Sequence, residues 1–161
     1  MRRVGCFRQL KYVIAKDLSD FDWIWVAQDR NGMLACFVTA GVGPVPQPLL
    51  LSWQNKSDEV ILSIEEYLLG LPILSSVNSR VGKAAGNFDS YYEMSKRGFF
   101  AFDWSDAQAH EAAKTGQYQI ISEPKTPLNI SSLSKNEVES LSVIKLPNVN
   151  FTMLDVTSIK A

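Results

Sequence analysis

A hairpin signal inside one long apolar run constrains the fold of this chain more than any other feature. The run covers residues 21–43 and reads FDWIWVAQDRNGMLACFVTAGVG. Its centre is Asp29-Arg30-Asn31-Gly32, where Asn31 and Gly32 both tolerate the positive φ of a type I′ turn. The run therefore predicts two antiparallel strands, 23–28 and 33–39, joined by a two-residue turn.

Both faces of this predicted strand pair are apolar. Trp25 alternates with Ile24 and Val26, and a two-residue turn would set Trp25 opposite Val38. Strands that are apolar on both sides lie inside a sheet, covered by other elements. We therefore expect the hairpin 23–39 at the centre of the core.

Helical and strand patterns continue along the rest of the chain. Ser57 and Asn87 are expected helix N-caps, and Ser134 with Glu137 forms a capping-box pattern. Glycines and prolines predict a loop at 41–48, and polar residues predict another at 74–86. Further strands are expected at 10–15, 99–104, 118–122 and 149–154, and helices at 58–69, 88–97, 106–115 and 135–143. This order predicts one α+β domain over residues 1–161, with helices packed on an antiparallel or mixed sheet.

Composition narrows the classes of partner and compartment. Hydrophobic residues make up 46% and charged residues 20% of the chain, as in ordinary folded proteins. The formal net charge of −1 argues against broad electrostatic binding of nucleic acid. The apolar runs are shorter than the roughly 20 residues of a membrane helix, and the N-terminus has no apolar signal-peptide core. We therefore expect a cytoplasmic protein that binds neither nucleic acid nor membranes.

The two cysteines, Cys6 and Cys36, both lie in apolar, strand-like surroundings. Such settings favour buried free thiols in a reducing compartment. A disulfide between the two remains the alternative if their strands are neighbours.

No pattern of catalytic or ligating residues stands out. The single histidine, His110, lies in the expected helix 106–115, where Asp106 is a simple surface neighbour. One histidine and two separated cysteines do not provide the usual ligands of a zinc site, and Gly82-Lys83 lacks the rest of a phosphate-binding loop. A magnesium site on clustered aspartates is conceivable, but turns and helix caps account for these residues. We predict no catalytic, cofactor-binding or metal-binding residue, and hence no enzyme.

Three segments together resemble a known family. They are WVAQDRNGMLACFVTAGVGPVP at 25–46, SKRGFFAFDWSD at 95–106, and YQIISEPKTPLNISSLS at 118–134. The set is similar to bacterial polymorphic-toxin immunity proteins, which are small proteins encoded beside secreted antibacterial toxins. The resemblance implies a cytoplasmic, non-enzymatic inhibitor that occludes a cognate toxin domain, expected to be a nuclease, at equal molarity.

Acidic residues are the first candidates for contact with such a toxin. Toxins that attack nucleic acid tend to be basic, so local acidic patches would steer and specify binding. Two patches are candidates: Asp17, Asp20 and Asp22 in one loop, and Asp103, Asp106 and Glu111 around the expected helix 106–115. Aromatic residues anchor many interfaces, and Trp53, Tyr91 and Tyr92 are the candidates of that type.

Two other functions remain open at this point. A small-ligand-binding protein or enzyme would need a pocket beside the loop 41–48, with convergent polar groups. A structural subunit of a bacterial assembly would associate with itself instead of with a toxin.

Overall fold

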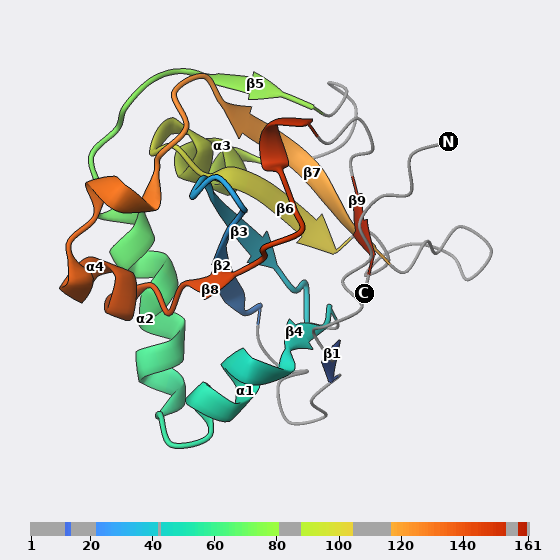
Figure 1. The fold of residues 1–161 in the computed structure, drawn as a ribbon, viewed down its shortest axis with the longest axis vertical. Coiled ribbons are helices and arrows are strands. Elements are labelled where there is room, and N and C mark those ends of the chain that lie inside the picture. Colours follow the sequence, from blue (N-terminus) through green and yellow to red (C-terminus); the bar gives the residue numbers. More distant parts are fainter. Residues whose placement is uncertain are drawn as a thin grey trace.

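The computed structural model describes residues 12–13, 22–41, 43–80, 88–104, 117–153 and 158–160. Figure 1 shows the arrangement of its helices and strands. In chain order the elements are β1 (Tyr12–Val13), β2 (Ile24–Gln28), β3 (Leu34–Val38), β4 (Val45–Pro46), α1 (Gln47–Trp53), α2 (Asp58–Leu69), β5 (Val77–Ser79), α3 (Asp89–Lys96), β6 (Phe100–Trp104), β7 (Gln117–Pro124), η3 (Ile130–Ser132), α4 (Lys135–Ser140), β8 (Ile144–Lys145), η4 (Phe151–Met153) and β9 (Ser158–Lys160). The predicted α+β class is confirmed, while the expected helix 106–115 lies outside the described residues.

The main sheet is mixed. Its strand order is β5-β7-β6-β3-β2-β8, and β9 pairs with β7 next to this path. The hairpin β2–β3 lies inside the sheet, because β6 pairs parallel with β3 and β8 pairs parallel with β2. The short strands β1 and β4 form a separate antiparallel pair. Of the two arrangements expected from the sequence, the mixed sheet is the one observed.

The hairpin is confirmed, but its predicted turn and register are wrong by one residue. Gly32 N donates to Asp29 O at 3.0 Å, and Asp29 N donates to Met33 O at 2.9 Å, which closes a three-residue loop. Gly32 has a φ of 80°, whereas Asn31 is not among the residues with positive φ. This is a type I turn followed by a left-handed residue. As a result Trp25 pairs with Phe37 and not with Val38.

One face of the sheet is a layer of stacked aromatic rings. Trp25 stacks on Phe37 at a centroid distance of 4.0 Å, and Phe37 stacks on Phe102 at 4.8 Å. The edge of Tyr118 meets the rings of both Trp25 and Phe37. Phe151 of η4 covers this layer and is itself buried. Such offset and edge contacts add stability beyond the area they bury.

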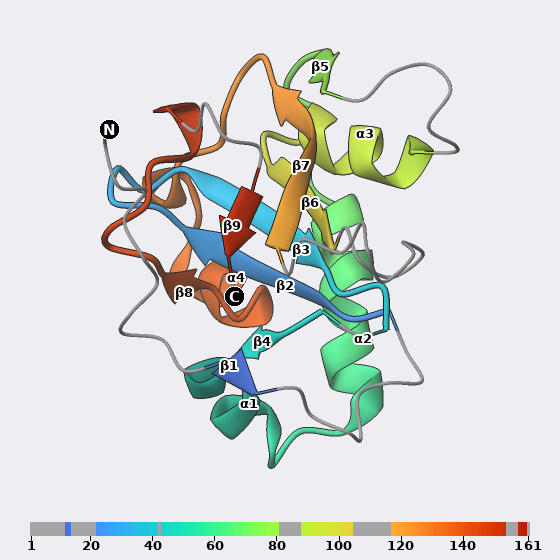
Figure 2. The same ribbon diagram turned by 90° about the vertical axis from the view of Figure 1, so that its right-hand side faces the viewer.

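Helices α2 and α3 cover the opposite face, behind the strands in the view of Figure 2. Cys36 of β3 points to this side, and its Sγ lies 3.2 Å from Sδ of Met94 on α3. The hydroxyl of Ser95 lies 2.6 Å from that of Ser122 on β7. None of the described helices is long and apolar enough to cross a membrane.

Several predicted boundaries match the structure. Helix α2 begins and ends at the expected residues, and the capping box of Ser134 and Glu137 opens α4. Helix α4 ends at Ser140, earlier than expected. Helix α3 begins at Asp89 with Phe88 as its N-cap residue. The expected cap, Asn87, lies outside the described residues.

Other expectations are wrong. The loop expected at 41–48 contains β4 and the start of α1. Pro48 is compatible with this helix because it lies in the first turn, where a backbone N–H has no partner within the helix. The loop expected at 74–86 contains β5. The strand expected at 149–154 is replaced by η4 over the described part of that range. Val149 and Phe151 are both buried, which gives the alternating pattern of a strand. The backbone N–H of Phe151, however, donates to Oδ2 of Asp29 and not to a neighbouring strand.

Candidate interaction surface

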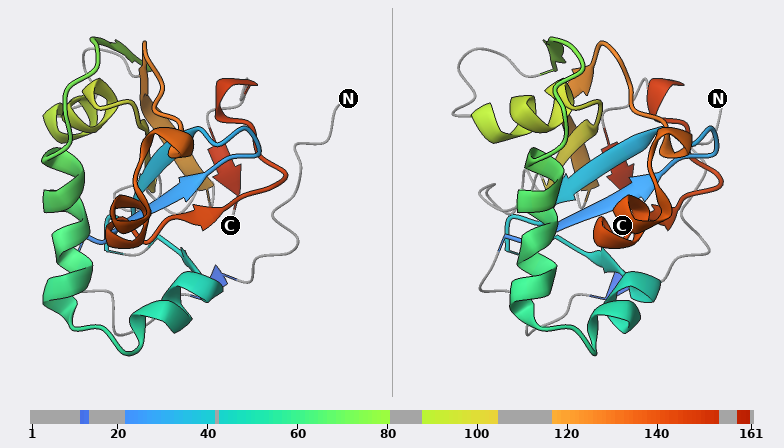
Figure 3. Two further views of the ribbon diagram at one scale, coloured as in Figure 1. Left: turned by 60° about the vertical axis from the view of Figure 1, so that its left-hand side comes forward. Right: turned by 90° about the vertical axis from the view of Figure 1, so that its left-hand side faces the viewer.

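Helix α2 has two chemically different sides. The side chain of Ser57 caps its first turn, and Gly70 follows its last residue. Ile61, Ile64 and Leu68 recur at helical spacing and are buried against the rest of the fold. The other side of the helix faces solvent, and Figure 3 (right) shows α2 in front of the sheet along this side of the molecule.

The exposed apolar residues of the structure are concentrated around α2. Single exposed apolar side chains are ordinary, but their concentration in one region indicates an interaction site. Among the described residues, every large hydrophobic side chain classed as exposed lies between residues 51 and 74: Leu51, Val60, Leu62, Tyr67, Ile73 and Leu74. Three of them belong to α2 itself.

The same helix is strongly acidic. Its sequence, DEVILSIEEYLL, contains four carboxylates and no basic residue. Helix α4, KNEVES, adds two carboxylates and one lysine, whereas the whole chain has a formal charge of only −1. Within the described ranges, none of the α2 carboxylates forms an ion pair. The negative charge of this region is therefore available to a partner.

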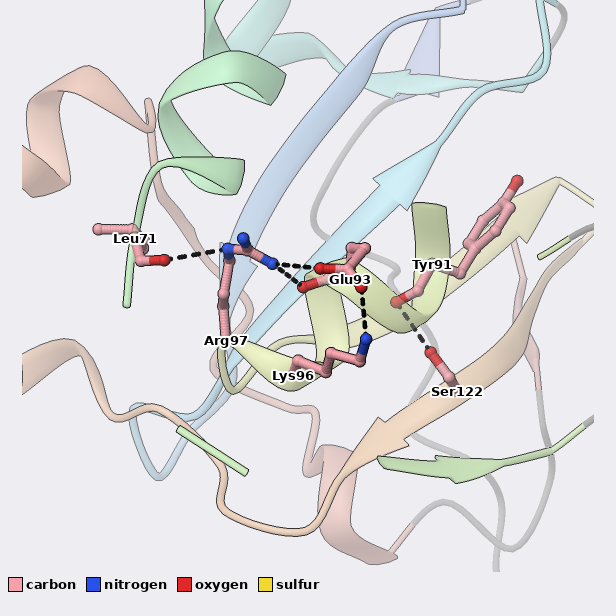
Figure 4. Close-up of polar contacts among 6 residues, drawn as sticks. All are labelled: Leu71, Tyr91, Glu93, Lys96, Arg97 and Ser122. Carbon is pink, nitrogen blue, oxygen red and sulfur yellow. Dashed lines mark hydrogen bonds and ion pairs between the residues drawn. The ribbon is translucent and has the colours of Figure 1, made fainter. Parts of the chain in front are cut away.

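Helix α3 shows the contrasting case of a neutralised carboxylate. Glu93 accepts hydrogen bonds from Lys96 and Arg97, and both lower the pKa of Glu93. Arg97 also donates to the backbone oxygen of Leu71, as Figure 4 shows. This network ties α3 to the segment after α2, and its charges are already satisfied within the protein.

A second acidic feature lies where α2, α3 and the sheet meet. The hydroxyl of Tyr91 donates a 2.7 Å hydrogen bond to Oδ1 of Asp103. Burial raises the pKa of Asp103, the bond from Tyr91 lowers it, and the charge of exposed Asp22 raises it. Burial also raises the pKa of Tyr91, and the hydrogen bond to Asp103 is the second cause that raises it.

Glu65 of α2 belongs to the same group. Burial and the charge of Asp22 both raise the pKa of Glu65. The surroundings of Glu65 and of Asp103 therefore disfavour the charged forms of these two carboxyl groups. A cation placed among them would relieve the repulsion and favour the ionised forms. We call Asp22, Glu65 and Asp103 the acidic cluster.

A groove lies between helices α2 and α4. Its volume is about 400 Å³. Lys56 also lines this groove, and its Nζ donates to Ser142 Oγ at 3.3 Å. The groove is lined on the α2 side by Val60, Ile61, Ser63, Ile64, Glu66 and Tyr67, and on the α4 side by Glu139, Ser140 and Ser142.

The structure brings two of the predicted contact residues together. Asp22 and Asp103 come from different predicted patches, yet the charge of Asp22 raises the pKa of Asp103, as it does that of Glu65. The other predicted contact residues, Asp17, Asp20, Asp106 and Glu111, lie outside the described residues.

The predicted aromatic anchors Trp53, Tyr91 and Tyr92 differ in solvent exposure. Trp53 is only 4% exposed and packs near Trp23, with ring centroids 6.0 Å apart, so its prediction as an exposed anchor is wrong. Tyr91 and Tyr92 are partly exposed on α3. Tyr91 is engaged with Asp103, and the hydroxyl of Tyr92 lies 3.0 Å from that of Ser79.

The alternative function requires a pocket beside residues 41–48, but this segment is tightly packed. Pro44, Val45 and Pro46 are buried, and Tyr118 donates a 2.9 Å hydrogen bond to the oxygen of Pro44. Among the described residues, no three His, Cys, Asp or Glu side chains converge to hold a metal ion. Cys36 is a free buried thiol, while Cys6 lies outside the described residues.

Sequence reasoning missed Glu65 and the groove. In the sequence, Glu65 and Glu66 lie on the polar side of the helical pattern 58–69, which is typical of any solvent-exposed helix face. A signal was present, since α2 has four acidic residues and no basic one. That Glu65 lies near Asp22 depends on tertiary contacts, which no local pattern encodes. Comparisons with protein-family models, curated proteins and solved structures find no match to this chain.

Proposed function

We propose that this protein is a cytoplasmic immunity protein, which binds a cognate antibacterial toxin domain at equal molarity and blocks it without chemistry of its own. The partner class comes from the resemblance of residues 25–46, 95–106 and 118–134 to polymorphic-toxin immunity proteins. The observation that carries the proposal is the surface around α2, where exposed apolar side chains lie among unpaired carboxylates.

This combination suits a protein interface better than a solvated helix. Apolar side chains at the centre of an interface supply most of the binding energy, and a charged rim supplies specificity and orientation. Carboxylates that form no ion pair within the described part of the chain gain a partner on binding, so their desolvation is compensated. A basic partner satisfies both conditions, and nuclease domains carry basic surfaces because their substrate is anionic.

The direct test is co-expression with the protein encoded next to this chain. The neighbour is produced with an affinity tag, and the untagged chain is expected to co-purify with it in a 1:1 ratio and to protect the host cells from it. An equally basic nuclease domain from an unrelated system serves as control for non-specific charge attraction. Absence of co-purification with the neighbour, or equal binding of the control nuclease, would refute the proposal.

A further inference from the structure

We infer that the groove between α2 and α4 is the toxin's docking site, and that it receives an apolar side chain flanked by a lysine or arginine of the toxin. The inference rests on the proposed function and adds the contact surface to it. Its basis is the shape, composition and charge of the groove.

The α2 wall of the groove presents apolar side chains that the fold leaves partly uncovered. Val60 is 50% exposed and Tyr67 is 36% exposed, and they lie seven residues apart on one side of α2. Ile64, between them in sequence, is buried beneath. An inserted apolar side chain would therefore contact Val60 and Tyr67 at once and remove both from water.

This groove suits a protein segment better than a small molecule. Small-ligand sites enclose most of the ligand surface, whereas Val60, Glu66 and Tyr67 at this site are all exposed to solvent. A groove that is open along a helix matches recognition by a partner's projecting side chains.

Charges along the groove define the orientation of the occupant. Lys56 precedes the first turn of α2, while Glu66 lies in its last turn and has no ion-pair partner among the described residues. On the α4 wall, Glu139 lies 3.8 Å from Lys135, an exposed and weak pairing. The basic residue of the toxin is therefore expected beside Glu66, and Lys56 disfavours a cation at the opposite end.

Two matched pairs of variants test this assignment on the full chain. Val60→Arg and Glu66→Lys alter the groove, and Thr126→Arg and Glu123→Lys introduce the same charges at solvent-accessible positions that lie outside the surface around α2 and do not line the groove. Tyr67→Ala is a milder third groove variant. The toxin domain encoded beside this chain is immobilised, and the Kd of each variant is measured, together with its unfolding midpoint as a check of folding.

The inference predicts that Val60→Arg and Glu66→Lys each raise Kd by at least about 30-fold, the loss typical of central interface residues. The two controls should change Kd by less than about threefold, as is usual for peripheral residues. If wild type binds and the folded groove variants bind no more weakly than their controls, the docking site is wrong and the proposed function stands. If wild type itself does not bind, the proposed function fails as well.

Discussion

The hydroxyl of Tyr91 on α3 donates a 2.7 Å hydrogen bond to the half-buried carboxylate of Asp103 at the end of β6. This contact joins a helix to the central sheet. Because burial and the charge of Asp22 both disfavour the charged form of Asp103, the bond offsets part of that cost. The Tyr91–Asp103 pair is therefore a structural support of the acidic cluster.

Tyr91→Phe is expected to lower the free energy of unfolding by about 1–2 kcal/mol at neutral pH, because Asp103 loses a donor to its charged form. Urea unfolding measures the change. Tyr92→Phe is the matched control: among the described residues its hydroxyl contacts that of exposed Ser79, and the substitution should cost less than about 0.5 kcal/mol. Equal effects of the two substitutions would show that the Asp103 bond does not support the fold.

Glu65→Gln is expected to make the protein slightly more stable at neutral pH. The pKa of Glu65 is raised in the folded state above its ordinary value of 4.5. The folded protein therefore holds this proton to higher pH than the unfolded chain, and stability falls as the pH rises through that interval. Glutamine removes this loss, giving a gain of a few tenths of a kcal/mol after screening by solvent.

The pH dependence distinguishes this mechanism from a simple packing change. The gain from Glu65→Gln should be present at pH 7 and should vanish below the ordinary pKa of 4.5, where the carboxyl is protonated in both states. Urea unfolding at the two pH values measures it, with Glu66→Gln as the exposed control. A gain that is the same at both pH values would contradict the account.

Gly43→Ala is expected to destabilise the protein by about 1–3 kcal/mol, because the added methyl group would overpack the site. A Cβ there would lie 2.7 Å from the Tyr118 hydroxyl and 2.9 Å from Cβ of Trp104. That hydroxyl also accepts from Nε1 of Trp25 at 3.2 Å, so it cannot move freely. At Gly70, where the nearest atom would be the backbone oxygen of Tyr67 at 3.3 Å, the same substitution should cost clearly less in thermal unfolding.

Asp29→Ala is expected to cost about 2–4 kcal/mol, because its buried carboxylate accepts several backbone hydrogen bonds. Oδ1 accepts from Asn31 N and Met33 N at 2.9 Å each, and Oδ2 accepts from Phe151 N at 2.9 Å. Asp29→Asn keeps the turn but places an amide N–H against that of Phe151. Chemical denaturation should rank wild type above Asp29→Asn and Asp29→Asn above Asp29→Ala. An alanine variant as stable as wild type would contradict the role.

Elements that close their own hydrogen bonds locally could be predicted from the sequence. Helix α2 carries its cap, its apolar stripe and its terminal glycine within the consecutive residues from Ser57 to Gly70, and its bounds are as expected. The hairpin was predictable for the same reason. Its register was not, because the side chain of Asp29 holds a type I turn in place and competes with the preference of Asn-Gly for a type I′ turn.

Features that depend on distant partners could not be predicted. β8 has two residues, and it is a strand only because β2 lies beside it. The 3-10 turn η4 depends on Asp29, more than a hundred residues earlier in the chain. The acidic cluster is of the same kind: Asp22 and Asp103 were candidates on separate patches, and only the fold lets the charge of Asp22 act on both Asp103 and Glu65.

Titration of the toxin's activity tests the central claim most directly. A fixed concentration of the toxin domain encoded beside this chain, well above the Kd, is mixed with increasing amounts of the purified protein, and residual nuclease activity is measured. A stoichiometric inhibitor predicts a linear fall to zero at one equivalent. Full activity in the presence of excess protein, or inhibition at far less than one equivalent, would contradict it.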